Sequence, residues 1–283
     1  MKQYLELLDR VMRDGVDRPN RTGIDTRALF GQTLRFDLRG GFPAVTTKKL
    51  SFKSVVAELL WFLSGSCNVK DLQAMGCHIW DANAEAPYWK PQAAFDGDVG
   101  RIYGVEWVDW VGWRGVSINQ IKNLINGLQN DPFDRRHIVT AWNPDDVINK
   151  RMCLPPCHIM FQCHVEPQQQ QRSLQHVIHL EMYQRSCDLF LGVPFNVASY
   201  ALLTHMLAGV CGYSPGELII HLADCHIYHN HFDQVSEQLS RTPYDLPTLE
   251  LREGVNHIDK FLVGDFSLSN YNFHPAISAP MAV

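Results

Sequence analysis

Residues 196–210 are apolar over most of the circumference of a helix, and Gly212 follows at a position suited to end one. A helix that is apolar on every side has to be covered on every side, so we expect this one at the centre of the molecule. It cannot belong to a small or extended fold, because other helices and strands must enclose it.

The segments that would enclose this helix are recognisable by their own periodicity. Apolar residues at helical spacing predict helices over residues 3–12, 52–63 and 118–128, and alternation predicts strands over residues 34–38 and 176–183. Four glutamines at residues 168–171 predict the exposed tip of a hairpin before the second strand. No repeat, linker or change of composition divides the 283 residues, so we predict a single domain over residues 1–283.

Composition limits the classes of function. A net charge of −5 at pH 7 argues against nucleic acid or an anionic membrane as the main partner. The first ten residues mix charged with apolar side chains, unlike a signal peptide, and we see no apolar run near the roughly 18 to 20 residues of a membrane span. Eight cysteines without a C-x-x-C pair indicate a reduced chain. These features predict a cytoplasmic protein.

The segment Leu154-Pro155-Pro156-Cys157-His158 carries the strongest chemical signal. Proline fixes its own φ and keeps the preceding residue out of the helical region, so we predict Cys157 at the rigid start of a strand. A thiol held there beside an imidazole suits a nucleophile, because the thiolate is the reactive form. The alternative is that Cys157 is one more small, buried, hydrophobic residue.

Other residues bear on the chemistry less directly. Glu58 lies in a helix that we expect to be covered on all sides, where a carboxylate is either paired or functional. The absence of G-x-G-x-x-G and of a Walker loop disfavours nicotinamide dinucleotides and P-loop nucleotide hydrolysis. The histidines of residues 221–231 match no common zinc spacing, so we predict no metal. Four arginines are candidates for holding a phosphate, with solvated surface charge as the alternative for each: Arg21, Arg135, Arg136 and Arg185.

These motifs together resemble those of the folate-dependent thymidylate synthases. Besides the Cys157 segment, the matching motifs follow the family's order and spacing from about residue 2 to the last residue: Asn20-Arg-Thr-Gly23, Glu58-Leu-Leu-Trp-Phe62, Asp134-Arg-Arg136, Tyr183-Gln-Arg-Ser-Cys-Asp188, Gly192-Val-Pro-Phe-Asn196 and Asp224-x-His226-Ile-Tyr228. Several independent motifs in register are far more specific than a Cys–His pair alone.

The resemblance implies a fold and a reaction. The fold would be α+β, with a large twisted sheet of mixed or antiparallel strands, flanking helices and the central buried helix. The reaction would be the reductive methylation of dUMP to dTMP. Cys157 would add to C6 of dUMP, and C5 would then attack the methylene group of 5,10-methylenetetrahydrofolate, which also supplies the hydride and leaves as dihydrofolate. A folate that is both carbon donor and reductant agrees with the missing dinucleotide motif.

The resemblance also implies roles for individual residues. The catalytic set would be Cys157, Glu58, Tyr103, Asn196, Asp188 and His158. The set that binds dUMP would be Arg21, Arg135, Arg136, Arg185, Ser186, Cys187, Asp188, Asn196, His226 and Tyr228. The set that contacts folate would be Lys48, Ser51, Trp80, Asp188 and Ala282. Asn196 would read the uracil ring, and His226 and Tyr228 would bind the deoxyribose hydroxyl. Arg135 and Arg136 would serve the site of the other subunit, which implies a homodimer.

Three positions depart from the commonest family pattern, and three alternatives stay open. Lys49 stands where arginine is usual, Ser51 at a variable position and Ala223 where glycine is usual, all bordering the folate or the tail. One alternative is a dUMP hydroxymethylase of the same fold, in which water attacks the methylene intermediate. Asn196 argues against a cytosine nucleotide but does not separate these two outcomes. A Cys–His hydrolase is a more distant alternative, and an RNA-binding role lacks a basic stripe.

Overall fold

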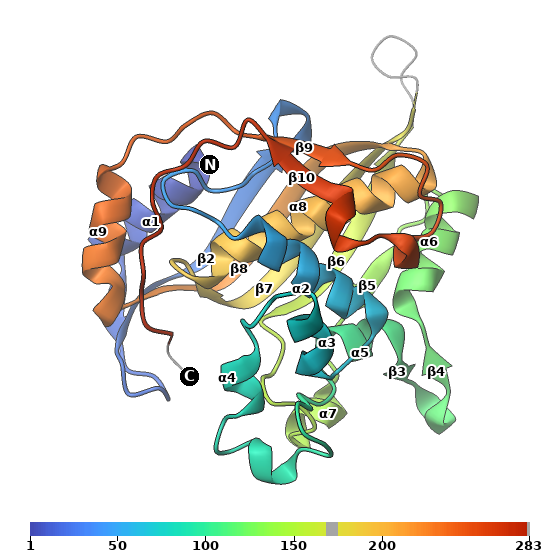
Figure 1. Ribbon diagram of the computed structural model, residues 1–283, viewed down its shortest axis with the longest axis horizontal. Coiled ribbons are helices and arrows are strands. Elements are labelled where there is room, and N and C mark those ends of the chain that lie inside the picture. Colours follow the sequence, from blue (N-terminus) through green and yellow to red (C-terminus); the bar gives the residue numbers. More distant parts are fainter. Residues whose placement is uncertain (168–174, 282–283) are drawn as a thin grey trace.

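The computed structural model describes residues 1–167 and 175–281 and is built on a twisted sheet of six strands (Figure 1). The strand order is β1-β2-β8-β7-β6-β5. The strands are β1 (Val16–Arg18), β2 (Thr26–Asp37), β5 (Ile138–Thr140), β6 (His158–Glu166), β7 (Val177–Asp188) and β8 (Ser214–Tyr228). β7 and β8 are parallel and the other neighbours are antiparallel. This mixed sheet confirms the predicted α+β fold class.

The central buried helix is α8 (Gly192–Cys211), which connects the two parallel strands. It packs on β7 and β8 and is covered on its far side by α2 (Phe52–Ser64). Gly212, with φ of +71°, ends the helix in the left-handed region that glycine tolerates. The structure therefore confirms that this helix is central and buried and that Gly212 ends it.

The sequence analysis found no apolar run near the length of a membrane span, and this statement is wrong. With 20 residues and a mean hydropathy of 1.3, α8 is long and apolar enough to cross a membrane by length and composition alone. Of its most apolar window, 78 % is buried inside the protein. A run of this length exists because the helix is enclosed on all sides, which produces the same composition as a lipid environment.

The remaining helices and hairpins surround this core. The predicted helices correspond to α1 (Lys2–Asp14), α2 and α6 (Gln120–Asn130), each within two residues at either end. The other elements are α3 (Val69–Ala74), α4 (Asp81–Ala84), α5 (Tyr103–Val108), α7 (Pro144–Ile148), α9 (Phe232–Ser240), and the hairpins β3 (Trp110–Val111) with β4 (Ser117–Ile118) and β9 (Thr248–Leu251) with β10 (Phe266–Ser269), together with six short 3-10 turns. Most of their apolar side chains join α8 in one hydrophobic cluster.

The strand predictions were correct in type but shorter than the strands. β2 begins eight residues before the predicted strand over residues 34–38, because Gly31, at φ of +73°, interrupts the alternation that marks a strand. The predicted strand over residues 176–183 is the first part of β7. The predicted hairpin tip at residues 168–171 lies outside the described residues.

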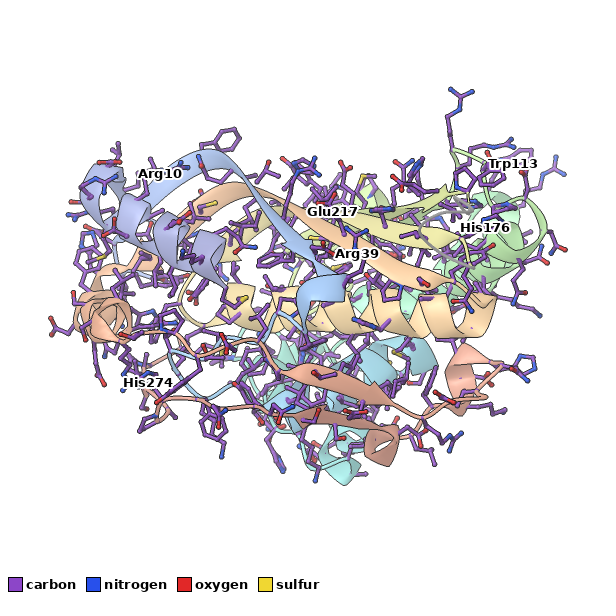
Figure 2. The ribbon with its side chains drawn as sticks, turned by 90° about the horizontal axis from the view of Figure 1, so that it is seen from above. Arg10, Arg39, Trp113, His176, Glu217 and His274 are labelled. Atoms are coloured by element: carbon purple, nitrogen blue, oxygen red, sulfur yellow. The ribbon has the colours of Figure 1, made fainter. Side chains whose placement is uncertain are left out.

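The face of the sheet turned away from α8 carries polar side chains, and we call it the outer face. Arg35 pairs with Glu217 there, and the His221 ring bridges Thr33 and Glu181. Figure 2 shows Glu217 over the strands on the side away from α8. The sheet thus has one apolar face, buried under α8, and one polar face that no described helix covers.

Candidate active site

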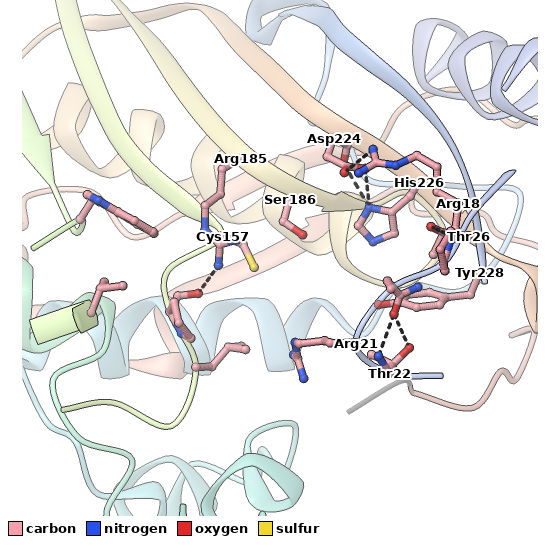
Figure 3. Close-up of a pocket in the computed structure, with 16 residues that line it drawn as sticks. Arg18, Arg21, Thr22, Thr26, Cys157, Arg185, Ser186, Asp224, His226 and Tyr228 are labelled. Carbon is pink, nitrogen blue, oxygen red and sulfur yellow. Dashed lines mark hydrogen bonds and ion pairs between the residues drawn. The ribbon is translucent and has the colours of Figure 1, made fainter. Parts of the chain in front are cut away.

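A cavity of about 380 Å³ opens where β7 and β8 end and β6 begins (Figure 3). This volume suits a small molecule. Of the residues predicted to bind dUMP or to react with it, the cavity is lined by Arg21, Cys157, Arg185, Ser186, His226 and Tyr228. Residues far apart in the sequence, from Arg21 to Tyr228, therefore meet in one cavity.

The register of the sheet explains how they meet. Asp224, His226 and Tyr228 alternate along β8, so their side chains lie on one face of the strand. On the neighbouring strands, Thr26 is opposite Tyr228 and Ser186 is opposite Asp224, and both also line the cavity. The floor of the site is thus a patch of sheet whose geometry is fixed by backbone pairing.

Cys157 immediately precedes β6, which confirms that it is held at the start of a strand. Its N–H donates to the Tyr103 hydroxyl oxygen at 2.7 Å, and its C=O accepts from the N–H of Arg185 at 2.8 Å. Burial raises the pKa of the Cys157 thiol, while the positive charges of Arg185 and Arg21 and a hydrogen bond from Tyr103 act to lower it. The site therefore contains groups that favour the thiolate in an otherwise desolvated position.

The two prolines have a second role that the sequence did not reveal. The Arg185 guanidinium donates from Nε to the Pro156 carbonyl at 2.7 Å and from Nη2 to the Pro155 carbonyl at 2.8 Å. These bonds fix the guanidinium beside the thiol, as Figure 3 shows. Arg21 reaches the same cavity from an exposed loop, which Asn20 closes by accepting from the N–H of Thr22 at 2.8 Å.

Two charged residues that the sequence did not single out for this site, Arg18 and Asp224, also line the cavity. Arg18 Nη1 lies 3.1 Å from Asp224 Oδ2, and Asp224 Oδ1 lies 3.3 Å from His226 Nδ1. The alternation of Asp224 with His226 and Tyr228 was a usable signal for Asp224. Arg18 had no such signal, because β1 is only three residues long and exposed.

The sequence predicted that Glu58 is either paired or functional, and the structure shows that it is paired with Trp80. Its Oε1 accepts from Trp80 Nε1 at 2.7 Å. Burial raises the pKa of Glu58 to about 7, and the hydrogen bond from Trp80 opposes that rise. Trp80 itself is buried against Trp61, Phe62 and Tyr103. A carboxyl group with a pKa near neutrality is able both to accept and to release protons.

The imidazole of His158 is held by two tyrosines. Its ring stacks on Tyr103 at 3.9 Å, and Nδ1 is 2.9 Å from the Tyr200 hydroxyl. Burial lowers the pKa of His158 to about 3, so the ring stays neutral. A Cys–His hydrolase needs an imidazole that takes the thiol proton, and this arrangement argues against that alternative.

Three other predicted residues lie at the ends of β7 and α8. Asn196 Oδ1 accepts from Gln184 Nε2 at 3.0 Å, so the buried Gln184 fixes the orientation of this amide. Asp188 Oδ1 accepts from the N–H groups of Phe190 and Leu191 at 3.0 and 3.1 Å. Cys187 is fully buried, and its thiol contacts the Gln184 carbonyl at 3.4 Å, away from the cavity.

The residues predicted to contact folate differ in exposure, since Lys48 and Trp80 are buried and Ser51 is exposed. The Lys48 amine is buried, donates to the Phe190 carbonyl and lies 3.5 Å from the centre of the Phe190 ring. To meet a folate glutamate, it would have to turn outward. Ser51 is exposed just before α2, with its hydroxyl 2.8 Å from that of Ser54. Ala282 lies outside the described residues.

Arg135 and Arg136 do not line the cavity of their own chain. Both are exposed, just before β5 at the edge of the sheet, and Arg136 Nε pairs with Asp134 Oδ1 at 2.9 Å. The same-chain cavity therefore contains the guanidinium groups of Arg18, Arg21 and Arg185 only, within the part of the chain that the structure describes.

Two further findings bear on the site. Within residues 1–167 and 175–281, no group of three or more His, Cys, Asp or Glu side chains is placed to hold a metal ion. A comparison with known protein families matches residues 2–283 to the thymidylate synthase family. The match covers nearly all of the 283 residues.

Proposed function

The chain belongs to the thymidylate synthase family, and we propose that it is a thymidylate synthase that converts dUMP to dTMP with 5,10-methylenetetrahydrofolate. Members of this family use that folate as co-substrate and are generally dimeric. The observation that carries the proposal is a single cavity in which a thiol, two guanidinium groups and a His–Tyr pair face one another: Cys157, Arg185, Arg21, His226 and Tyr228. A nucleoside monophosphate presents an electrophilic ring, a phosphate and a sugar hydroxyl to match them.

Cys157 is the nucleophile of the proposed reaction. Its sulfur forms a bond to C6 of dUMP, and the electron pair of the C5–C6 double bond moves toward O4, which makes C5 nucleophilic. The Arg185 guanidinium supports this step because it favours the thiolate over the thiol. Tyr103, whose hydroxyl oxygen already accepts from the N–H of Cys157, assists removal of the C5 proton.

Arg21 and Arg185 bind the phosphate, with Ser186 beside them. Asn196 reads the uracil edge, since an amide offers one donor and one acceptor to O4 and N3. The hydrogen bond from Gln184 supports this reading because it fixes which way the amide faces. His226 and Tyr228 bind the deoxyribose hydroxyl.

Trp80, Asp188 and Glu58 are the residues that we assign to the folate side. When bound, the folate supplies the one-carbon unit and the hydride. A pterin presents amino and N–H donors that suit the carboxylate of Asp188, and a flat ring that an indole flanks. Glu58 holds and moves protons, which its pKa of about 7 supports.

We propose a homodimer in which Arg135 and Arg136 complete the phosphate site of the partner subunit. Both arginines are exposed and neither lines the cavity that contains Cys157 of the same chain. These two facts support a role in the cavity of the partner subunit. The outer face of the sheet is the surface best suited to meet a second copy, because it is broad and no described helix covers it. We further propose one catalytic domain over residues 1–283 and a cytoplasmic location.

The decisive experiment is a mass spectrum of the nucleotide formed from dUMP and methylenetetrahydrofolate. A methyl increment, with dihydrofolate as the other product, is the expected result. A hydroxymethyl increment with tetrahydrofolate would instead identify a hydroxymethylase of the same fold. Unchanged dUMP in the presence of intact enzyme and folate would overturn the proposal.

A further inference from the structure

Arg18 and Asp224 line the cavity, and none of the roles proposed above uses them. Arg18 Nη1 lies 3.1 Å from Asp224 Oδ2, and the other oxygen, Asp224 Oδ1, lies 3.3 Å from His226 Nδ1. Figure 3 shows the three side chains in this order, with the guanidinium of Arg18 against Asp224 and the ring of His226 beside the carboxylate. The arrangement is a chain of polar contacts that ends on a ring proposed to touch substrate.

The contacts determine which nitrogen of His226 carries a proton. Nδ1 faces two oxygen acceptors, the Asp224 carboxylate at 3.3 Å and the Asp224 backbone carbonyl at 3.1 Å. Neither oxygen donates a hydrogen when the carboxylate is ionised, so Nδ1 must be the donor. The pKa of Asp224 is lowered, chiefly by its hydrogen bond with His226, which keeps the carboxylate ionised. In a neutral ring, Nε2 is then left as an acceptor.

We propose that Arg18 and Asp224 are positioning residues that hold His226 with Nε2 as an acceptor, and so make the site select nucleotides that carry a free sugar hydroxyl. This inference rests on the proposed function, which assigns His226 to the deoxyribose hydroxyl. A hydroxyl donates its hydrogen to Nε2, whereas a 3′-deoxy sugar leaves Nε2 without a partner in a partly desolvated site. Outer contacts that fix a histidine tautomer in this way also occur around metal-bound histidines.

The exposure of the Arg18–Asp224 pair makes the idea testable without unfolding the protein. The two side chains are 56 % and 34 % exposed, and ion pairs of this kind contribute little to stability. The chain offers a control in Arg13 and Asp9 on α1, which pair at 3.0 Å with side-chain exposures of 62 % and 56 %. Arg13→Gln removes the same kind of charge from the same kind of pair, outside both the cavity and the outer face.

The test compares dUMP with 2′,3′-dideoxyuridine 5′-monophosphate as substrates. Wild-type protein should prefer dUMP by about 10- to 100-fold in kcat/KM, as expected for one buried hydrogen bond. Arg18→Gln should reduce this preference several-fold, mainly by raising KM for dUMP, with little change for the dideoxy analogue. Asp224→Asn should reduce it further, because the amide replaces one of the two carboxylate oxygens by an NH2 group, and this group then faces a donor on Arg18 or on His226. Arg13→Gln should keep the wild-type preference.

A double mutant shows whether Arg18 acts through Asp224. If it does, Arg18→Gln should have almost no additional effect on the preference in the Asp224→Asn background. An equal loss for both nucleotides in Arg18→Gln would overturn the inference, because it would mean that Arg18 contacts the phosphate directly. An unchanged preference in both single variants would also overturn it.

A binding measurement separates this inference from the proposed function. The dissociation constants of dUMP and of the dideoxy analogue are measured by calorimetry on the same variants, without folate. If wild-type protein makes no dTMP yet binds dUMP more tightly than the analogue, and Arg18→Gln loses that difference, the inference stands while the proposed function fails. Equal affinity of wild-type protein for the two nucleotides would overturn the inference even if turnover occurs.

Discussion

Trp80 Nε1 donates a hydrogen bond to Glu58 Oε1 at 2.7 Å. The bond joins α2 to the turn before α4 and is enclosed by the rings of Trp61 and Phe62. A donor of this kind stabilises the charged form of a carboxyl group, while burial stabilises the neutral form. The balance leaves the pKa of Glu58 at about 7.

Replacing Trp80 with phenylalanine should therefore change the pH dependence of turnover. Trp80→Phe removes the hydrogen bond that lowers the pKa of Glu58, so this pKa should rise above its value of about 7. The limb of the kcat profile that reports Glu58 should move to higher pH. The measurement is kcat from pH 5.5 to 9 with both substrates saturating. The exposed Trp113→Phe serves as control, and an unmoved limb in Trp80→Phe would contradict the role of Glu58.

Cys157→Ser should separate binding from chemistry. A serine hydroxyl is a far weaker nucleophile, so kcat should fall by at least about 10³-fold, while the dissociation constant of dUMP should change little because Arg21 and Arg185 remain. Steady-state turnover and calorimetry are the two measurements. Cys211→Ser, at the end of α8 and away from the cavity, should keep near-normal turnover. Turnover close to normal in Cys157→Ser would exclude Cys157 as the nucleophile.

Asn196→Asp should shift the preferred base from uracil toward cytosine. A carboxylate accepts from the exocyclic amino group of cytosine, whereas O4 of uracil needs a donor. The ratio of kcat/KM for dUMP over dCMP should fall by about 100-fold or more. Asn130→Asp, an exposed change of the same chemistry on α6, should leave the ratio unaltered. If the ratio is the same in Asn196→Asp and wild type, the pyrimidine is read by other residues.

Glu106 should make the protein less stable at alkaline pH. This carboxyl group is completely buried beside Asp146 and Arg101, and burial, followed by the neighbouring carboxyl group of Asp146, raises its pKa to about 8. In the unfolded chain it ionises near 4.5, so the stability it provides is complete at lower pH and is lost as pH rises toward 8. Glu106→Gln keeps a donor for Asp146 without that ionisation.

Urea denaturation at pH 5.5 and 8.5 tests this prediction. The free energy of unfolding of Glu106→Gln minus that of wild type should be larger at pH 8.5 than at pH 5.5, by on the order of 1–2 kcal/mol, because only wild type loses stability over this range. The exposed Glu6→Gln should follow wild type at both values of pH. Parallel pH dependences for wild type and Glu106→Gln would contradict a raised pKa of Glu106 in the folded protein.

Mixing two inactive variants tests whether sites are shared between subunits. Cys157→Ala lacks the nucleophile, and Arg136→Ala lacks part of the proposed phosphate site of the partner. After unfolding and refolding together, half of the dimers are mixed and each has one intact site, so activity at limiting dUMP should approach about a quarter of wild type. Pairing Cys157→Ala with itself controls for refolding. No recovery in the mixture would place Arg136 outside the partner's site.

The sequence predicted the helices better than the sheet, for a physical reason. α1, α2 and α8 are recognisable because each shows a full apolar stripe or an apolar circumference over three turns or more. The order of strands depends on which distant segments pair, and no local pattern reports that β2 lies beside β8. The parallel pairing of β7 with β8 depends on α8 crossing between them, which is a property of the whole unit.

The residues of the site show the same contrast between local patterns and the pairing of distant strands. Cys157 and Arg185 belong to motifs that are recognisable locally, and the sheet brings them together as expected. Arg18 and Asp224 meet only because β1 pairs with β2 and β2 with β8, so no spacing in the sequence predicts their contact. His158 was grouped with the catalytic residues by its position beside Cys157, but successive residues of a strand point to opposite faces.

The hydrogen bonds between Arg185 and the Cys157 segment fix the distance between the guanidinium group and the thiol. The backbone of Arg185 donates to the Cys157 carbonyl, and its side chain is tied to the two carbonyls just before it. The main chain of residues 155–157 therefore determines how far the phosphate-binding guanidinium lies from the reactive sulfur. A nucleotide lengthened by one methylene between sugar and phosphorus would be seated by its phosphate and arrive with the wrong atom against the sulfur.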